Sequence, residues 1–141
     1  MKTILVACAF FIGSAPSGEA VAQQDSLPPN AEAAIGAATS FSVGYGVWLW
    51  EKKCRKLPAA ESAAFDAAVT GQMQRFSGML DLQMFNAILG AGQDTAKDTA
   101  TTPPCEDPDA LDFAMFGVEM VKDSGEQLAT IPLDYHLAIA N

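Results

Sequence analysis

Small and hydrophobic residues fill the stretch from residue 33 to residue 50, which contains no charged side chain. The stretch ends in Trp48 and Trp50, and four cations follow it around Cys54. Its alanine content favours a helix, whereas its three glycines each cost up to about 1 kcal/mol in a helix interior unless they serve close helix contact. A proline then ends the helix, because the residue before a proline avoids the α region. We therefore predict a first helix over residues 31 to 56.

Apolar residues at intervals of three and four predict three more helices. The clearest one covers residues 58 to 77, and its apolar face consists of Phe65, Val69, Met73 and Phe76. The next covers residues 79 to 90, where nearby glycines favour a helix end. The last covers residues 108 to 124, with Asp107 as its N-cap. With a polar linker over residues 91 to 107, the pattern predicts an all-α, four-helix single domain.

The N-terminal residues 1 to 22 have the layout of a secretory signal peptide, in which one lysine precedes nine apolar residues. Nine apolar residues are too few to cross a bilayer. We expect cleavage after Ala22, with cleavage after Ala20 and lipidation at Cys8 as alternatives. Residues 23 to 30 then form a short flexible lead-in.

Removal of the leader leaves two cysteines, Cys54 and Cys105. In an oxidising compartment an even pair indicates one disulfide bond. The bond would close a loop of fifty residues, which is worth about 4 kcal/mol in chain entropy. The alternative is a reactive thiol, because the cations around Cys54 would lower the pKa of its thiol. We favour the disulfide, because the only histidine, His136, lies in the C-terminal tail.

The chain without its leader has seven basic and sixteen acidic residues, so its net charge is −9. Such a chain is a poor match for nucleic acid, whose phosphates require clustered lysine and arginine. No nucleotide, haem, calcium or zinc-protease motif is present. One acidic cluster, explained by helix capping more simply than by a metal site, consists of Glu106, Asp107, Asp109 and Asp112. We therefore expect no enzyme activity, no cofactor and no metal.

The uncharged stretch permits three interpretations: a buried core helix, a peripheral contact with a membrane or a partner, and a membrane span. The tryptophans and cations at its end are typical of the aromatic belt and basic flank of a span. Serine, threonine and glycine dilute the stretch, however, and a span would place both cysteines in the cytoplasm, where disulfides do not persist. We therefore favour the core helix.

Two surfaces are candidates for recognition. For the four cations we favour a solvated helix end, which suits the helix dipole; the alternative is a contact with an anionic partner or lipid, with the tryptophans as anchors. The last predicted helix is apolar over much of its circumference, so it is either central or carries an exposed patch. The candidate contact residues are Trp48, Trp50, Lys52, Lys53, Arg55, Lys56, Phe113, Phe116 and Met120.

In its layout, the chain is similar to the small periplasmic acid-stress chaperones. The resemblance rests on the spacing of Cys54 and Cys105 and on the helical pattern, because those chaperones are also exported helical domains with one disulfide closing a loop of similar size. It implies that acid would neutralise the carboxylates, leave the cations charged and loosen the domain until apolar surface is exposed.

We therefore expect an exported, non-enzymatic interaction or accessory protein of the bacterial cell envelope that binds an unidentified protein partner. The periplasm is the expected location, with the medium as the alternative. Two other hypotheses stay open: a periplasmic acid-stress or holdase-type chaperone, and a membrane-associated envelope protein held by residues 33 to 56.

Overall fold

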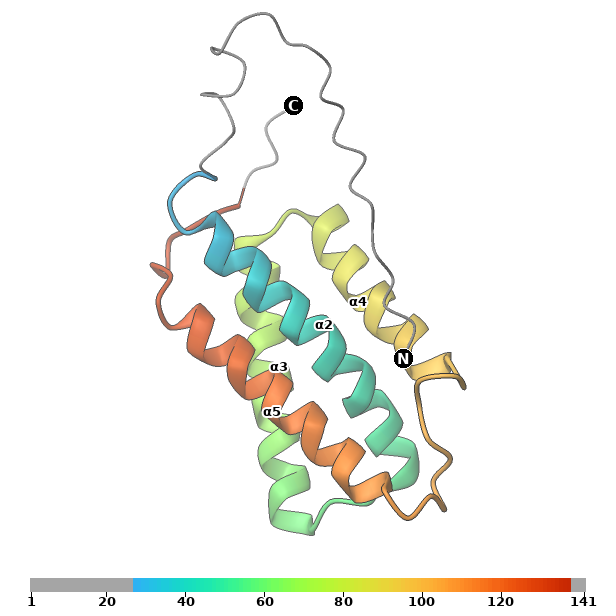
Figure 1. Ribbon diagram of the computed structural model, residues 1–141. Helices are drawn as coiled ribbons and strands as arrows, with labels where there is room; N and C mark the ends of the chain where they lie inside the picture. The colour runs from blue at the N-terminus through green and yellow to red at the C-terminus, as the bar shows by residue number, and fades with distance from the viewer. Residues whose placement is uncertain (1–26, 138–141) are drawn as a thin grey trace, which may run out of the picture.

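The computed structural model describes residues 27 to 137 (Figure 1). Within that range the regular elements are four helices: α2 (Ala31–Cys54), α3 (Ala59–Met79), α4 (Leu82–Lys97) and α5 (Ala110–Leu128). The predicted all-α single domain of four helices is therefore confirmed. The predicted leader, residues 1 to 22, lies outside the described residues.

α2 is the central helix, and the other three pack around it (Figure 1). α2 runs in the same direction as α4 and opposite to α3 and α5. Its packing against α5 and α4 is more extensive than its packing against α3. The side chains of Ala34, Ala37 and Phe41 are fully buried, so much of the uncharged stretch forms the core. No helix between residues 27 and 137 is long and apolar enough to cross a membrane.

Two glycines determine how closely α2 approaches its neighbours. A Cβ atom on Gly44 would lie 2.5 Å from Val121 Cγ2 of α5, and one on Gly46 would lie 2.6 Å from the carbonyl oxygen of Gly92 in α4. Neither position has room for a side chain unless a neighbour moves. Both residues keep a helical conformation within α2, so these glycines permit close packing and do not break the helix.

α4 is longer than predicted. The predicted helix end at Gly90 and the predicted linker over residues 91 to 107 are wrong in part, because α4 continues to Lys97. Gly92 is buried against α2. The absence of a side chain at this position therefore permits close packing of α4 on α2 and does not end the helix. The N-terminus of α4 is capped by Asp81, whose carboxylate accepts a hydrogen bond from the backbone N–H of Met84 at 2.8 Å.

α5 both begins and ends later than the predicted residues 108 to 124. Asp109, and not Asp107, occupies the N-cap position. The carboxylate of Asp107 instead accepts a hydrogen bond from the backbone N–H of Asp109 at 2.8 Å, within the turn that leads into α5. At its other end the helix continues to Leu128.

One end of the bundle holds the predicted disulfide bond between Cys54 and Cys105, whose Cα atoms are 5.1 Å apart. The turn from α2 into α3 is organised there by the buried carboxylate of Glu51. That carboxylate accepts hydrogen bonds from the backbone N–H groups of Lys56 at 3.0 Å and Leu57 at 2.9 Å. Its two oxygens thus satisfy donors that follow the last turn of α2.

At the opposite end, the C-terminal segment docks on the turn between α3 and α4. The backbone N–H of Leu137 donates to the carbonyl oxygen of Met79 at 2.9 Å, and Leu137 forms an isolated parallel bridge with Leu80. The guanidinium group of Arg75 donates to the carbonyl oxygens of residues 131 to 133. These bonds hold Leu137 beside the first turn of α4.

Candidate functional site

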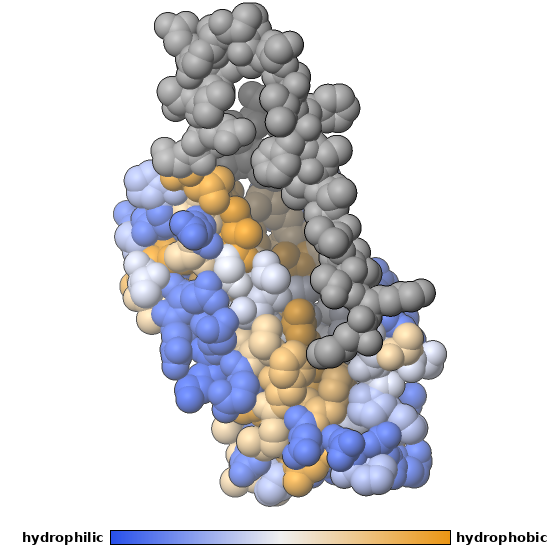
Figure 2. All heavy atoms as spheres, in the orientation of Figure 1, coloured by the Kyte–Doolittle hydropathy of each residue, from blue (hydrophilic) through white to orange (hydrophobic). Residues whose placement is uncertain are grey.

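One side of α2 is not covered by another helix. Figure 2 shows hydrophobic residues gathered over α2 and the adjoining part of α5, with hydrophilic residues along their border. Within α2, Ile35 is 46% exposed, and Val43, two helical turns further on, is half-buried. Part of the hydrophobic surface in this view therefore lies over the central helix.

A second apolar feature borders this side, and we call it the α5 flank: Phe113, Phe116 and Met120. Spacings of three and four residues place these side chains on one side of α5. Phe116 is 47% exposed, and its ring centroid lies 6.5 Å from that of Phe113. The α5 flank thus presents an exposed aromatic ring that is supported from beneath by a half-buried one.

Trp50 supports the α5 flank from inside the molecule. Its ring meets that of Phe113 edge to face at a centroid distance of 4.9 Å, and its indole N–H donates to the carbonyl oxygen of Pro103 at 2.8 Å. The tryptophan is only 6% exposed. The side chain of Trp50 therefore holds the loop before Cys105 in place, and the contact of Trp50 with a partner or a membrane stays a prediction.

Trp48 points to the opposite side of α2, towards α3. Its indole N–H donates to an Asp66 carboxylate oxygen at 2.7 Å, and the Lys52 ammonium lies 2.6 Å from the same oxygen. Lys52 also lies 5.2 Å from the centroid of the Trp48 ring, a cation–π distance. These two donors hold the pKa of the Asp66 carboxyl below its ordinary value, and Lys52 has the larger effect. Both predicted contact residues are therefore engaged within the chain.

The remaining predicted cations, Lys53, Arg55 and Lys56, are exposed. In the part of the chain that the structure describes, the Lys52–Asp66 pair is the only ion pair. The side chains of these three cations are therefore not committed to a carboxylate of the described residues.

The structure places the two sets of predicted hydrophobic contact residues differently. Phe113, Phe116 and Met120 lie together, as their shared side of a helix predicts. Trp48 and Trp50 lie apart, because two positions along a helix correspond to about 200° of rotation.

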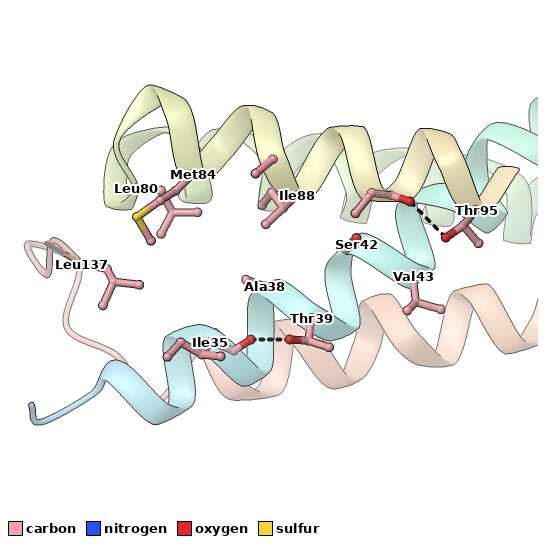
Figure 3. Close-up of a pocket in the computed structure, with 12 residues that line it drawn as sticks. Ile35, Ala38, Thr39, Ser42, Val43, Leu80, Met84, Ile88, Thr95 and Leu137 are labelled. Atoms are coloured by element: carbon pink, nitrogen blue, oxygen red, sulfur yellow. Dashed lines mark hydrogen bonds between the residues drawn. The ribbon is translucent and has the colours of Figure 1, made fainter. Parts of the chain in front are cut away.

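A groove that the sequence did not predict lies between α2 and α4, and we call it the α2–α4 groove. It has a volume of about 520 Å³. Figure 3 shows side chains of both helices pointing into it, with Leu80 and Leu137 closing one end and Thr95 standing at the other. Its lining consists of Ile35, Ala38, Thr39, Ser42, Val43, Leu80, Met84, Ala87, Ile88, Ala91, Thr95 and Leu137.

A smaller pocket lies at the disulfide end and has a volume of about 410 Å³. We call it the lysine pocket, because Lys53 of α2 and Lys97 of α4 both line it. Trp50 and the two disulfide-bonded cysteines form part of its remaining wall. Its position follows from the parallel course of α2 and α4, which brings the C-terminal ends of both helices together.

Within residues 27 to 137, no group of three or more histidine, cysteine, aspartate or glutamate side chains gathers to hold a metal ion. No family model, curated protein or solved structure matches the chain.

Proposed function

We propose that the protein is an exported, non-enzymatic interaction protein of the bacterial cell envelope that binds a protein partner through the α5 flank. The observation that carries the proposal is the exposure of Phe116, which is 47% exposed although it stands on a packed aromatic pair. An aromatic ring held in this way loses little conformational freedom on binding, and preorganisation of that kind favours affinity.

The surroundings of the α5 flank resemble a protein interface in composition. Aromatic residues and methionine are enriched at the centre of such interfaces, and charged residues are concentrated at the rim. Here Asp112, Glu119 and Asp123 follow the solvent side of α5 beside the flank and are exposed. Lys53, Arg55 and Lys56 are exposed at the disulfide end of the bundle. A partner with an apolar centre and charges of both signs at its edge would complement this surface.

The test begins with a photo-crosslinking amino acid at position 116, in cells that produce the full chain. The matched position is 133, because Leu133 is also an exposed hydrophobic residue but lies far along the chain from the α5 flank. The proposal expects a discrete crosslinked protein from position 116 that position 133 does not give.

The partner identified in this way is then purified, and its affinity is measured for Phe116→Ser, Met120→Ser and Leu133→Ser. Loss of a central aromatic anchor costs 2 kcal/mol or more, so Phe116→Ser should weaken binding by about thirtyfold or more. Leu133→Ser should bind as the unaltered chain does. Equal affinity for Phe116→Ser and Leu133→Ser would refute the proposal.

The acid-stress chaperone stays a second candidate, because one structural feature favours it. The carboxylate of Asp66 joins α3 to Trp48 and Lys52 of α2, and acid protonates it and so removes its charge. Of the three neighbouring helices, α3 packs least extensively on α2. Release of α3 would uncover apolar core, which a holdase requires. Suppression of the aggregation of a model client at acidic pH, with no effect at neutral pH, would support this candidate.

A further inference from the structure

The walls of the α2–α4 groove are almost wholly aliphatic. Two of its hydroxyl groups are satisfied within their own helices: Thr39 donates to the carbonyl oxygen of Ile35 at 2.9 Å and Thr95 to that of Ala91 at 3.0 Å (Figure 3). These two hydroxyl groups therefore already have an acceptor within the chain. The lining includes no charged side chain and no aromatic ring, so it offers neither an ion partner nor a stacking surface.

The shape of the groove favours a linear occupant. Its lining on α2 runs from Ile35 to Val43 and on α4 from Met84 to Thr95, which correspond to about 12 Å and about 16 Å along the helix axes. Because the two helices run side by side, the groove is a trough along them (Figure 3). The volume of about 520 Å³ lies within the range of small-molecule sites, which often lie between the helices of a bundle.

One end of the trough differs from the other in charge. Leu80 and Leu137 close the first end with aliphatic side chains. At the second end, Thr95 is followed directly by Ala96 and Lys97, which line the lysine pocket together with Lys53. A ligand that fills the trough and reaches beyond Thr95 would therefore place its end group near two ammonium groups. In a chain of net charge −9, such a pair selects for an anionic end group.

From the aliphatic trough and the two lysines at one end, we infer that the protein binds a single-chain anionic amphiphile, such as a long-chain carboxylate. The alkyl chain lies in the α2–α4 groove, with its methyl end towards Leu80 and Leu137. The anionic head group lies at Lys53 and Lys97. The site is separate from the α5 flank, so this inference does not depend on the proposed protein partner.

The first experiment titrates the purified full chain with straight-chain alkanoates from octanoate to hexadecanoate by calorimetry, each below the concentration at which it forms micelles. Each methylene buried in the groove should tighten binding by about fourfold. Binding should be one to one, and the gain should stop once the trough is full. Affinity that keeps increasing with chain length up to hexadecanoate, or more than one alkanoate bound per protein, would show that alkanoates adsorb non-specifically to apolar surface. Either result would overturn the inference.

The second experiment fills the groove from its rim. Ala91 lines the groove and is exposed, so Ala91→Phe adds a ring without disturbing the core. If the ring displaces two methylenes of the ligand, affinity falls by about fifteenfold. The matched control is Ala67→Phe, at an exposed alanine of α3. Equal affinity for the two variants, each shown to be folded by circular dichroism, would place the ligand elsewhere.

The third experiment tests the head group. In the double variant Lys53→Gln, Lys97→Gln, the affinity for the alkanoate should fall by between about twofold and about thirtyfold, since each exposed ion pair contributes about 0.2–1 kcal/mol. The affinity for the alcohol of the same chain length should not change. Lys56→Gln serves as the control for a general change of charge. A double variant that loses both ligands equally, or neither, would refute the assigned orientation.

A final variant keeps the two proposals apart. Phe116→Ser alters the α5 flank but not the lining of the groove. It should therefore leave the affinity for the alkanoate unchanged and lower the affinity for the protein partner. If it abolishes alkanoate binding, the amphiphile binds on the α5 flank and the inference about the groove is wrong.

Discussion

Replacement of Gly46 by alanine tests the close packing of α2 on α4. It should lower the free energy of unfolding, whereas the same substitution at an uncrowded position of the bundle should raise it. The new Cβ atom would lie 2.6 Å from the carbonyl oxygen of Gly92. That oxygen is part of the α4 backbone and cannot rotate away, so α2 and α4 must separate locally. Overpacking of this kind costs roughly 2–3 kcal/mol, and the higher helix propensity of alanine returns about 1 kcal/mol. Gly46→Ala should thus destabilise the fold by about 1–2 kcal/mol.

Gly71→Ala is the matched control. Gly71 lies within α3, and a Cβ atom there would meet no atom within 4 Å. Only the propensity term remains, so this variant should be more stable than the unaltered chain by about 1 kcal/mol. Urea denaturation of the two oxidised variants, followed by circular dichroism, measures the difference, which we expect to be about 2–3 kcal/mol. If Gly46→Ala proves as stable as Gly71→Ala, α2 and α4 are not in close contact at this position.

Three further predictions concern the disulfide end and the α2–α3 contact. Glu51→Ala removes an acceptor of two backbone hydrogen bonds and should cost about 3–5 kcal/mol in urea denaturation, whereas Glu51→Gln, which retains one acceptor oxygen, should cost about half as much. Reduction of the Cys54–Cys105 bond opens a loop with a sequence separation of 51 and should lower the free energy of unfolding by about 4 kcal/mol; unfolding midpoints with and without reductant that coincide would contradict this. The folded-state pKa of Asp66 is lowered by Lys52 and Trp48, so its contribution to stability is present above the unfolded-state pKa, near 4, and is lost as pH falls through the folded-state value. Asp66→Asn should therefore show a smaller loss of thermal stability between neutral and acidic pH, and an unchanged acid profile would be inconsistent with the contact.

The sequence predicted α3, α4 and α5 because each has an apolar side that repeats at helical spacing, and it predicted α2 because the uncharged stretch is rich in alanine. The end of α4 could not be predicted in the same way. A glycine near the end of a periodic segment usually marks a left-handed helix end, but Gly92 is needed for a different reason, namely its contact with Gly46. That contact depends on how α2 and α4 are placed, which local sequence does not encode. The α2–α4 groove could not be predicted for the same reason, because it also depends on the relative placement of these two helices.

The positions of the two tryptophans, by contrast, were accessible from the sequence. Residues two apart on a helix point in nearly opposite directions, so Trp48 and Trp50 could not both anchor one contact. Which of them would be buried was not accessible. Burial of Trp50 depends on the loop that carries Pro103, and this loop is placed beside α2 by the disulfide bond. Phe113, Phe116 and Met120 share one side of a helix, and this part of the candidate site followed from spacing alone.

The exposed apolar side of α2 follows from the composition of this helix and the number of its neighbours. Between positions 33 and 50 α2 carries no charged residue, so the side that it turns towards water holds only uncharged residues, among them the exposed Thr39. Three helices of the described domain pack around it, and Ile35 and Val43 remain on the side that they leave open. The amphiphile that we propose for the α2–α4 groove would cover both of these residues, because both line the groove.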